Sequence, residues 1–371
     1  MRILYIANRA EVFSGGQISL LELLQGLNRR SFEPFLLCPG EGGMAESARD
    51  MGIEVRLWDM MRAKTGNIKR IIAKALELRS IIKEIDPDIV HTNGTRAQFY
   101  VAMACKGLST RILWHVREAA RDIPLYDWFL AVSSKGIICV SNAVKEKRFG
   151  NYPFISSRIR VIYNGVDMNK FNPDEVAARK IKHEIGIDER SRLLGIIGLV
   201  IPPKGHRFLF EAFALVSRKY PDARLIVAGR TVNKAYKSDL ERLTREMGIA
   251  EKVVFLGFRE DIKSILSALD IFVLPSENEG FSRCVIEAMS CAKPIITTDI
   301  GGNNEAIVNA HSGLLVPYGD VGALAGAIER MLEDPESARR MGENAQKRVR
   351  ELFSIESHVS SVEKLYEDIT K

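Results

Sequence analysis

Short apolar runs of strand length alternate with helix-length segments along almost the whole of this 371-residue chain. The runs are 3–7, 35–38, 54–58, 89–92, 112–116, 136–140 and 161–163 in the first half, and 193–198, 224–228, 253–256, 271–274, 294–297 and 314–316 in the second. Because strands that alternate with helices form parallel sheets covered by helices, this order predicts an α/β protein. The length exceeds one ordinary core, so we expect two such domains.

The domain boundary is predicted near Asn164-Gly165-Val166-Asp167. We expect residues 1–164 to form the first domain and 165–354 the second. A last helix, within 355–371, follows a complete set of second-half elements. We expect it to pack back on the first domain.

Composition places the chain among soluble globular proteins, with 46% hydrophobic and 27% charged residues. No run of eighteen apolar residues predicts a membrane-spanning helix, and the apolar run after Met1 is too short for a signal peptide. The cysteines are scattered and form no Cys-x-x-Cys pair: Cys38, Cys105, Cys139, Cys284 and Cys291. These features predict a cytoplasmic protein without a disulfide framework or zinc site.

Positive charge is concentrated in the first half. Residues 1–165 hold 24 Lys and Arg against 16 Asp and Glu, whereas the remainder has two more acids than bases. The predicted helix 68–85 carries part of this charge beside an apolar set. Such a helix can contact the anionic inner face of a membrane, although a surface helix packed on its own sheet is the commoner explanation of the pattern. No nucleic-acid-binding motif is found.

The segment 274–288 carries the strongest chemical signal. The strand 271–274 runs into the polar loop Pro275-Ser276-Glu277-Asn278-Glu279-Gly280-Phe281, and Ser282 is a suitable N-cap for a helix containing Glu287. In α/β sheets ligands bind at the carboxyl ends of strands, and a helix start attracts anions such as phosphate. Two carboxylates therefore flank a predicted phosphate site.

In each half, a glycine-containing turn follows the first predicted strand. Gly15-Gly16 opens a helix and lets the backbone approach a ligand, yet it is neither Gly-x-Gly-x-x-Gly nor a P-loop. Lys204-Gly205 occupies the matching place in the second half, where Lys204 could hold a phosphate. Each signal is weak by itself.

Together these segments resemble the retaining glycosyltransferases of group 1, which have the GT-B fold. Glu279 and Glu287 match the Glu-x7-Glu signature of that family, and Gly15-Gly16, residues 161–167, Lys204-Gly205 and residues 301–305 agree in order. The likeness is clearest over residues 160–320. It implies two Rossmann-like parallel-sheet domains that face each other across a cleft, the second binding a nucleotide sugar and the first an acceptor.

The resemblance also implies roles for individual residues. Glu279 would bind hydroxyls of the transferred sugar and Glu287 the ribose. Lys204 would neutralise the leaving diphosphate. The amides of Gly280, Phe281 and Ser282 would touch the sugar, and those of Cys284 and Val285 the diphosphate.

His115 matches a histidine that the family places near the transferred sugar, although a satisfied core histidine at a strand end is the alternative interpretation. The segment 114–122 around it suits either acceptor binding or an interdomain cluster of ion pairs. One departure from the family concerns Leu199, which stands where an arginine usually grips the diphosphate. Arg283, on the first turn of the site helix, is a candidate substitute, and Arg207 is another.

These features predict a hexosyltransferase that moves a sugar from a nucleotide-diphosphate sugar to a sugar or lipid-linked acceptor in bacterial polysaccharide or glycolipid assembly. A helix start and Lys204 can stabilise the departing anion, and no Asp-x-Asp at a strand end indicates a metal or other cofactor. The alternatives are a non-catalytic nucleotide-sugar-binding protein and a glycoside hydrolase that uses the two carboxylates.

Overall fold

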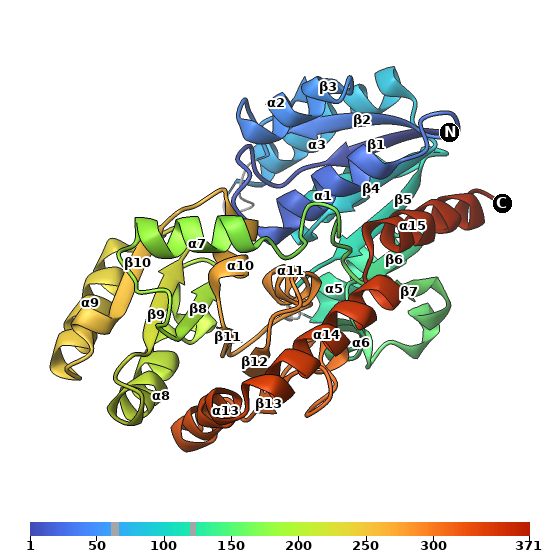
Figure 1. Ribbon diagram of the computed structural model, residues 1–371. Helices are drawn as coiled ribbons and strands as arrows, with labels where there is room; N and C mark the ends of the chain where they lie inside the picture. Colours follow the sequence, from blue (N-terminus) through green and yellow to red (C-terminus); the bar gives the residue numbers. More distant parts are fainter. Residues whose placement is uncertain (61–66, 119–123) are drawn as a thin grey trace. The chain divides into compact units, whose positions relative to one another are not determined.

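The computed structural model describes residues 1–60, 67–118 and 124–371. The chain divides into two compact units, one of Met1–Gly165 with Ile355–Lys371 and one of Val166–Ser354. Each unit holds one parallel sheet flanked by helices (Figure 1). The prediction of two parallel-sheet α/β domains is therefore confirmed.

The first unit has a seven-stranded sheet in the order β3-β2-β1-β4-β5-β6-β7. Its strands are β1 (Arg2–Ile6), β2 (Glu33–Cys38), β3 (Glu54–Leu57), β4 (Ile89–Asn93), β5 (Arg111–Val116), β6 (Gly136–Cys139) and β7 (Ile159–Val161). Its helices are α1 (Gly15–Gly26), α2 (Gly43–Asp50), α3 (Ile68–Ile85), α4 (Thr95–Ala104), α5 (Pro124–Val132), α6 (Asn142–Phe149) and α15 (Ile355–Thr370), with a 3₁₀ turn over Pro153–Arg158.

The two faces of this sheet bury separate apolar clusters. One cluster joins Tyr5 and Leu113 to side chains of α1 and α15, including Leu23 and Val362. The other joins the opposite face to α3 and α4. Because successive strand residues point to opposite faces, strands buried on both sides are apolar almost throughout, as the sequence of β1 is.

The second unit has a six-stranded sheet in the order β10-β9-β8-β11-β12-β13. Its strands are β8 (Leu193–Ile197), β9 (Arg224–Ala228), β10 (Val253–Gly257), β11 (Ile271–Leu274), β12 (Ile295–Thr298) and β13 (Leu314–Val316). Its helices are α7 (Glu175–Glu184), α8 (His206–Lys219), α9 (Lys234–Glu246), α10 (Ile262–Ala268), α11 (Arg283–Ser290), α12 (Asn303–Ala306), α13 (Val321–Glu333) and α14 (Pro335–Leu352), with 3₁₀ turns over Pro202–Lys204 and Ala250–Lys252. Helix α8 packs against α13, α7 against α10 and α11 against α14.

One predicted strand is misplaced. We expected 161–163, whereas β7 spans Ile159–Val161. The register pairs Ile159 with Ile137 and Val161 with Cys139, so pairing with β6 begins earlier than the apolar run suggested. Residues 159–163 all suit a strand except Arg160, and only the partner strand decides which of them pair.

Candidate active site

The strand order defines a switch point in each sheet. In the second unit β8 and β11 are neighbours in the sheet. The chain continues from β8 to β9 on one side of this pair and from β11 to β12 on the other side. Ligands of open α/β sheets bind at this point, beyond the carboxyl ends of the strands. Lys204 lies in the turn that follows β8, and Glu279 lies in the loop that follows β11.

The structure brings Lys204 and Glu279 together. The Lys204 ammonium donates to Oε1 of Glu279 at 2.5 Å, and the hydroxyl of Ser276 donates to the same oxygen at 2.8 Å. Both side chains are only partly exposed. A cation and a carboxylate that are 75 residues apart in sequence thus meet beyond the carboxyl ends of β8 and β11.

Lys204 keeps its positive charge although its side chain is largely buried. Burial disfavours the ammonium ion, but the Glu279 carboxylate more than offsets that effect, so the pKa of Lys204 is raised above its ordinary value. Lys204 is therefore cationic at neutral pH.

Backbone hydrogen bonds fix the loop that carries Glu279. The Thr298 hydroxyl donates to the carbonyl of Ser276 at 2.6 Å, and the amide of Gly302 donates to the carbonyl of Glu279 at 3.1 Å. Thr298 is the last residue of β12, the next strand in the sheet, and Gly302 lies in the segment that follows it. These hydrogen bonds fix the backbone of the loop and therefore the position of the Glu279 carboxylate.

The turn before α8 packs directly on this loop. Gly205 has φ +75°, and a Cβ there would lie 2.0 Å from the carbonyl oxygen of Pro275. Only glycine permits both the left-handed backbone and the close approach. The glycine beside Lys204 therefore sets the distance between the two strand-end loops.

Helix α11 begins at Arg283, as predicted, with Ser282 at the N-cap. The Ser282 hydroxyl makes no capping hydrogen bond, which differs from what its residue type suggests. Among the described residues, the amides of Cys284 and Val285 donate to no side chain. The first turn thus keeps donors and the positive end of the helix dipole for a ligand.

The remaining predicted residues of this segment occupy defined places. Phe281 is buried, with its ring centroid 5.1 Å from that of Phe353, so only its backbone could face a ligand. Gly280 is partly exposed in the loop. Burial raises the pKa of the Cys284 thiol to about 12, which keeps it neutral.

Arg283 and Glu287 form a buried ion pair within α11. Both Nη2 and Nε of Arg283 donate to Oε1 of Glu287, at 3.0 and 3.2 Å. Their side chains are 4% and 8% exposed. The residue predicted to grip a diphosphate and the residue predicted to bind ribose are therefore joined to each other.

The first unit has its own switch point between β1 and β4. Helix α1 begins at Gly15 after the loop that follows β1, and Asn93 at the end of β4 donates to the carbonyl of Gly16 at 3.1 Å. Arg117 donates through Nε to Asn93 Oδ1 at 2.5 Å. The glycine turn is thereby tied to the ends of β4 and β5.

His115 is the penultimate residue of β5 and is fully buried. Its Nδ1 lies 3.2 Å from Nε2 of His91, whereas its Nε2 has no hydrogen-bond partner within the described ranges. Burial, assisted by the charge of Arg117, lowers the pKa of His115 well below its ordinary value. Its ring is therefore neutral and buried, with a hydrogen-bond partner on Nδ1 alone among the described residues. Residues 119–122 of the predicted acceptor segment lie outside the described residues.

Sequence reasoning missed several residues that organise these sites: Ser276, His91, Asn93 and Tyr366. His91 and Asn93 stand in a fully buried strand. A polar side chain in such a strand needs a partner, and this was a usable signal.

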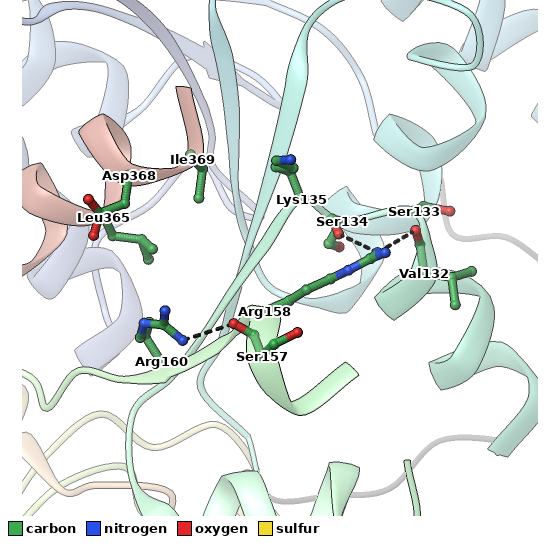
Figure 2. Close-up of a pocket in the computed structure, with 10 residues that line it drawn as sticks. All are labelled: Val132, Ser133, Ser134, Lys135, Ser157, Arg158, Arg160, Leu365, Asp368 and Ile369. Carbon is green, nitrogen blue, oxygen red and sulfur yellow. Dashed lines mark hydrogen bonds between the residues drawn. The ribbon is translucent and has the colours of Figure 1, made fainter. Parts of the chain in front are cut away.

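A pocket of about 560 Å³ lies elsewhere in the first unit (Figure 2). It adjoins the amino ends of β6 and β7 and the last turns of α15, and its lining includes Lys135, Arg158 and Arg160. Arg158 donates to the carbonyls of Val132 and Ser134. The pocket contains none of the predicted site residues.

The described residues hold no group of three or more His, Cys, Asp or Glu side chains placed to bind a metal ion. No helix among them is both long and apolar enough to span a bilayer.

Comparison with known proteins defines the class. The family described as "Glycosyl transferases group 1" matches residues 178–348, and "Glycosyltransferase Family 4" matches residues 13–170. A glycosyltransferase from Rickettsia africae superposes with a TM-score of 0.89 at 23% identity, covering 100% of this chain and 98% of that one. HepE from Anabaena, solved with UDP-glucose, gives 0.87 at 20% identity over 99% and 100%. These likenesses define a GT-B fold.

Two curated relatives align with most of this chain. UDP-Gal:alpha-D-GlcNAc-diphosphoundecaprenol alpha-1,3-galactosyltransferase from Escherichia coli is 26% identical over 378 residues, or 95% of this chain and 96% of the relative. The capsular polysaccharide biosynthesis glycosyltransferase CapM from Staphylococcus aureus is 27% identical over 86% and 88%. The chain belongs to the group 1 glycosyltransferases and is a glycosyltransferase, as its sequence predicted.

Proposed function

We propose that this enzyme moves a sugar from a nucleotide-diphosphate sugar to an acceptor hydroxyl with retention of anomeric configuration. The observation that carries the proposal is the Lys204–Glu279 pair, 2.5 Å apart beside the start of α11. The printed name of the E. coli relative specifies UDP-Gal, and HepE was solved with UDP-glucose. Both support a nucleotide sugar as donor.

The roles follow from charge. Cleavage of a sugar–diphosphate bond leaves negative charge on the departing oxygen and positive charge on the sugar. Lys204 and the amides at the start of α11 would stabilise the anion, and Glu279 would hold sugar hydroxyls beside the cationic centre. Because these groups already supply positive charge, we assign no step to a metal ion, and we expect chelators to leave the rate unchanged.

Retention is attributed to attack on the same face from which the diphosphate leaves, with the leaving phosphate assisting the incoming hydroxyl. No protein nucleophile is assigned. The lipid-linked acceptor in the name of the E. coli relative and the capsular polysaccharide in the name of CapM support an acceptor of that kind.

Glu279→Ala is the decisive variant. We expect transfer to fall on the order of 10²-fold or more while nucleotide binding persists. Glu277→Ala is the matched control, because Glu277 is an exposed acid of the same loop. A panel of nucleotide sugars, screened by thermal shift, identifies the donor first, since a bound donor raises the melting temperature.

Three outcomes would contradict the proposal. Transfer by Glu279→Ala at the parent rate would remove the assigned role of Glu279. Tight donor binding without transfer or donor hydrolysis would indicate a binding protein. Sugar release from a simple glycoside without nucleotide would indicate a hydrolase.

We further propose that α3 contacts an anionic membrane surface. Its Ala75 and Leu78 are buried, whereas Ile68, Ile72 and Leu76 are 67%, 46% and 58% exposed at intervals of four residues. Basic side chains share the helix: Lys69, Arg70, Lys74, Arg79 and Lys83. An exposed apolar stripe among cations suits an anionic lipid interface.

Co-sedimentation with vesicles tests this contact. The parent protein is expected to bind vesicles that contain anionic lipid, and Ile72→Glu/Leu76→Glu is expected to lose that binding. The control Val176→Glu places one glutamate at an exposed apolar helical position of the second unit. Equal binding by all three proteins would contradict a role for α3.

A further inference from the structure

The pocket drawn in Figure 2 is strongly cationic. Among the described residues, three cations and one acid line it. Lys135 precedes β6, whereas Arg158 and Arg160 flank the first residue of β7. The acid is Asp368 of α15, and its carboxylate lies 3.3 Å from the ammonium group of Lys371. The charge of the lining is therefore positive.

None of the three lining cations forms an ion pair with an acid within the described ranges. Other arginines of the same unit do so: Arg2, Arg49, Arg56 and Arg148. Cations that share a cavity without acid partners repel one another. An anion placed among them would be stabilised by all three.

Main-chain carbonyls hold the two guanidinium groups of the pocket. Arg158 donates through Nη1 to the carbonyls of Val132 and Ser134, both at 3.1 Å. Arg160 donates through Nη1 to the carbonyl of Ser157 at 2.9 Å. The Nε and Nη2 groups of both arginines have no hydrogen-bond partner in the described part of the chain. These two groups form the edge of a guanidinium that binds phosphate through two parallel hydrogen bonds.

The remaining lining suits a ligand larger than a bare anion. The Ser157 hydroxyl makes no hydrogen bond among the described residues and is a further donor. Val132, Leu365 and Ile369 add apolar surface. The volume of about 560 Å³ falls within the range of small-molecule sites and exceeds what a bare phosphate fills. The pocket therefore fits a phosphate group attached to an organic body.

The pocket lies away from the switch point of the first sheet. Its cations stand at the amino ends of β6 and β7, whereas Asn93 and Arg117 lie at the carboxyl ends of β4 and β5. In a parallel sheet these two edges are a strand length apart, about 13 Å for the four residues of β6. A ligand in this pocket is thus separate from the groups at the switch point.

We propose that this pocket binds the phosphate group of a small organic phosphomonoester or of a phospholipid headgroup. Arg158 and Arg160 hold phosphate oxygens through Nε and Nη2, and Lys135 adds a third positive charge. The apolar wall contacts the organic part of the ligand. Because α15 forms one side of the pocket, the bound ligand joins this helix to the ends of β6 and β7.

Two probes that share this group test the site and separate the two sources. Calorimetric titration with glycerol 3-phosphate tests a soluble phosphomonoester. Co-sedimentation with vesicles that contain phosphatidic acid tests the same group in a membrane. In the vesicle experiment every protein also carries Ile72→Glu/Leu76→Glu, so that α3 does not contribute.

Lys135→Ala/Arg160→Ala is the test variant, because it removes two cations and leaves the hydrogen bonds of Arg158 intact. We expect it to bind the probe on the order of tenfold or more weakly, since two charged contacts are lost. Arg160→Lys keeps the charge but loses the two-donor edge, and we expect an intermediate loss.

Two controls define specificity. Arg30→Ala/Lys106→Ala removes the same charge from exposed side chains of the first unit that lie outside the pocket. Lys204→Ala alters the strand-end site of the second unit. We expect both controls to bind the probe as tightly as the parent protein.

Each outcome decides for or against the site. Binding of glycerol 3-phosphate that the test variant loses supports a soluble ligand, and binding of the vesicles alone, lost in the same variant, supports a lipid headgroup. Binding of neither probe would overturn the inference. An equal loss in Arg30→Ala/Lys106→Ala would show general charge attraction, and a loss in Lys204→Ala would place the phosphate in the second unit; either result would also overturn it.

These measurements do not depend on the proposed function, because none of them follows sugar transfer. The pocket can fail to bind a phosphate while transfer stands, and the reverse result is equally readable. Should Lys135→Ala/Arg160→Ala not fold, Arg160→Lys decides, and unchanged probe binding by that variant would then overturn the inference.

Discussion

Gly205 shows how a single residue controls the geometry of the second-unit site. Its position between Lys204 and α8 requires a left-handed backbone and leaves no room for a Cβ beside the Pro275 carbonyl. The residue type was readable from the sequence as a turn glycine. Its contact with a loop 70 residues later was not, because only the folded sheet brings the two together.

We expect Gly205→Ala to lower the free energy of unfolding by about 1–3 kcal/mol and to reduce transfer by displacing the Glu279 loop. Gly248→Ala is a matched control: its φ of +70° is similar, but a Cβ there meets nothing within 4 Å. Urea unfolding of both variants measures the difference. Equal losses would show that backbone strain alone is responsible and that the Pro275 contact contributes nothing.

Lys204 supplies a second residue-scale prediction. Lys204→Ala is expected to lower kcat on the order of 10²–10³-fold, since the leaving diphosphate loses its nearest cation. Lys204→Arg is expected to restore part of that loss, because it keeps the charge but changes the geometry. Steady-state kinetics with the identified donor measures both variants. An unchanged kcat in Lys204→Ala would remove Lys204 from the mechanism.

At the scale of elements, α11 carries a buried ion pair that joins its first residue, Arg283, to Glu287 one turn later. The helix itself was predictable, because Ser282 and the following apolar pattern indicate it. The ion pair was harder to predict from the sequence, because residues four apart on a helix can meet but most such pairs are exposed and weak. Here both side chains are buried, and burial makes the loss of either partner costly.

Removing one partner of a buried pair leaves a desolvated charge. We therefore expect Glu287→Ala to lower the free energy of unfolding by about 3–5 kcal/mol. The double variant Arg283→Met/Glu287→Leu, which removes both charges, is expected to regain most of that stability. Urea unfolding distinguishes the two proteins. A double variant as unstable as the single one would mean that packing, and not the unpaired charge, causes the loss.

The sequence predicted the order of strands and helices along the chain, but it did not predict which side chains of different elements make contact. Alternating apolar runs located strands in both halves and placed Glu279 and Lys204 after the correct strands. The pairing of Lys204 with Glu279 and of Tyr366 with His91 depends on strand order and on the path of α15. Neither is encoded by local periodicity, so neither could be predicted from one sequence.

At the scale of the whole molecule, buried histidines tie stability to pH. Burial lowers the pKa of His206 to about 4 and that of His91 to about 3, against an ordinary value of 6.5. Below pH 6.5 the unfolded chain binds protons that the folded protein does not. Stability is therefore greatest above pH 6.5 and falls as the pH drops toward 4 for His206 and 3 for His91, by at most about 1.4 kcal/mol per pH unit for each group.

His206→Gln isolates one of these contributions. Between pH 7 and pH 5 the parent protein is expected to lose about 2 kcal/mol more stability than the variant. Urea unfolding at the two pH values gives the comparison, and carboxylates titrate alike in both proteins. Equal losses would show that His206 is protonated to the same extent in the folded and unfolded states.

Helix α15 has a consequence for how the protein is made. It completes the apolar cluster on one face of the first sheet with Val359, Val362, Leu365 and Ile369, and its Tyr366 hydroxyl is hydrogen-bonded to His91. The ribosome delivers these residues only after the whole of Val166–Ser354 has been translated. The second unit, being continuous in sequence, can thus mature first, while the first unit waits with an uncovered apolar face. During synthesis that nascent face is where we expect chaperones to engage.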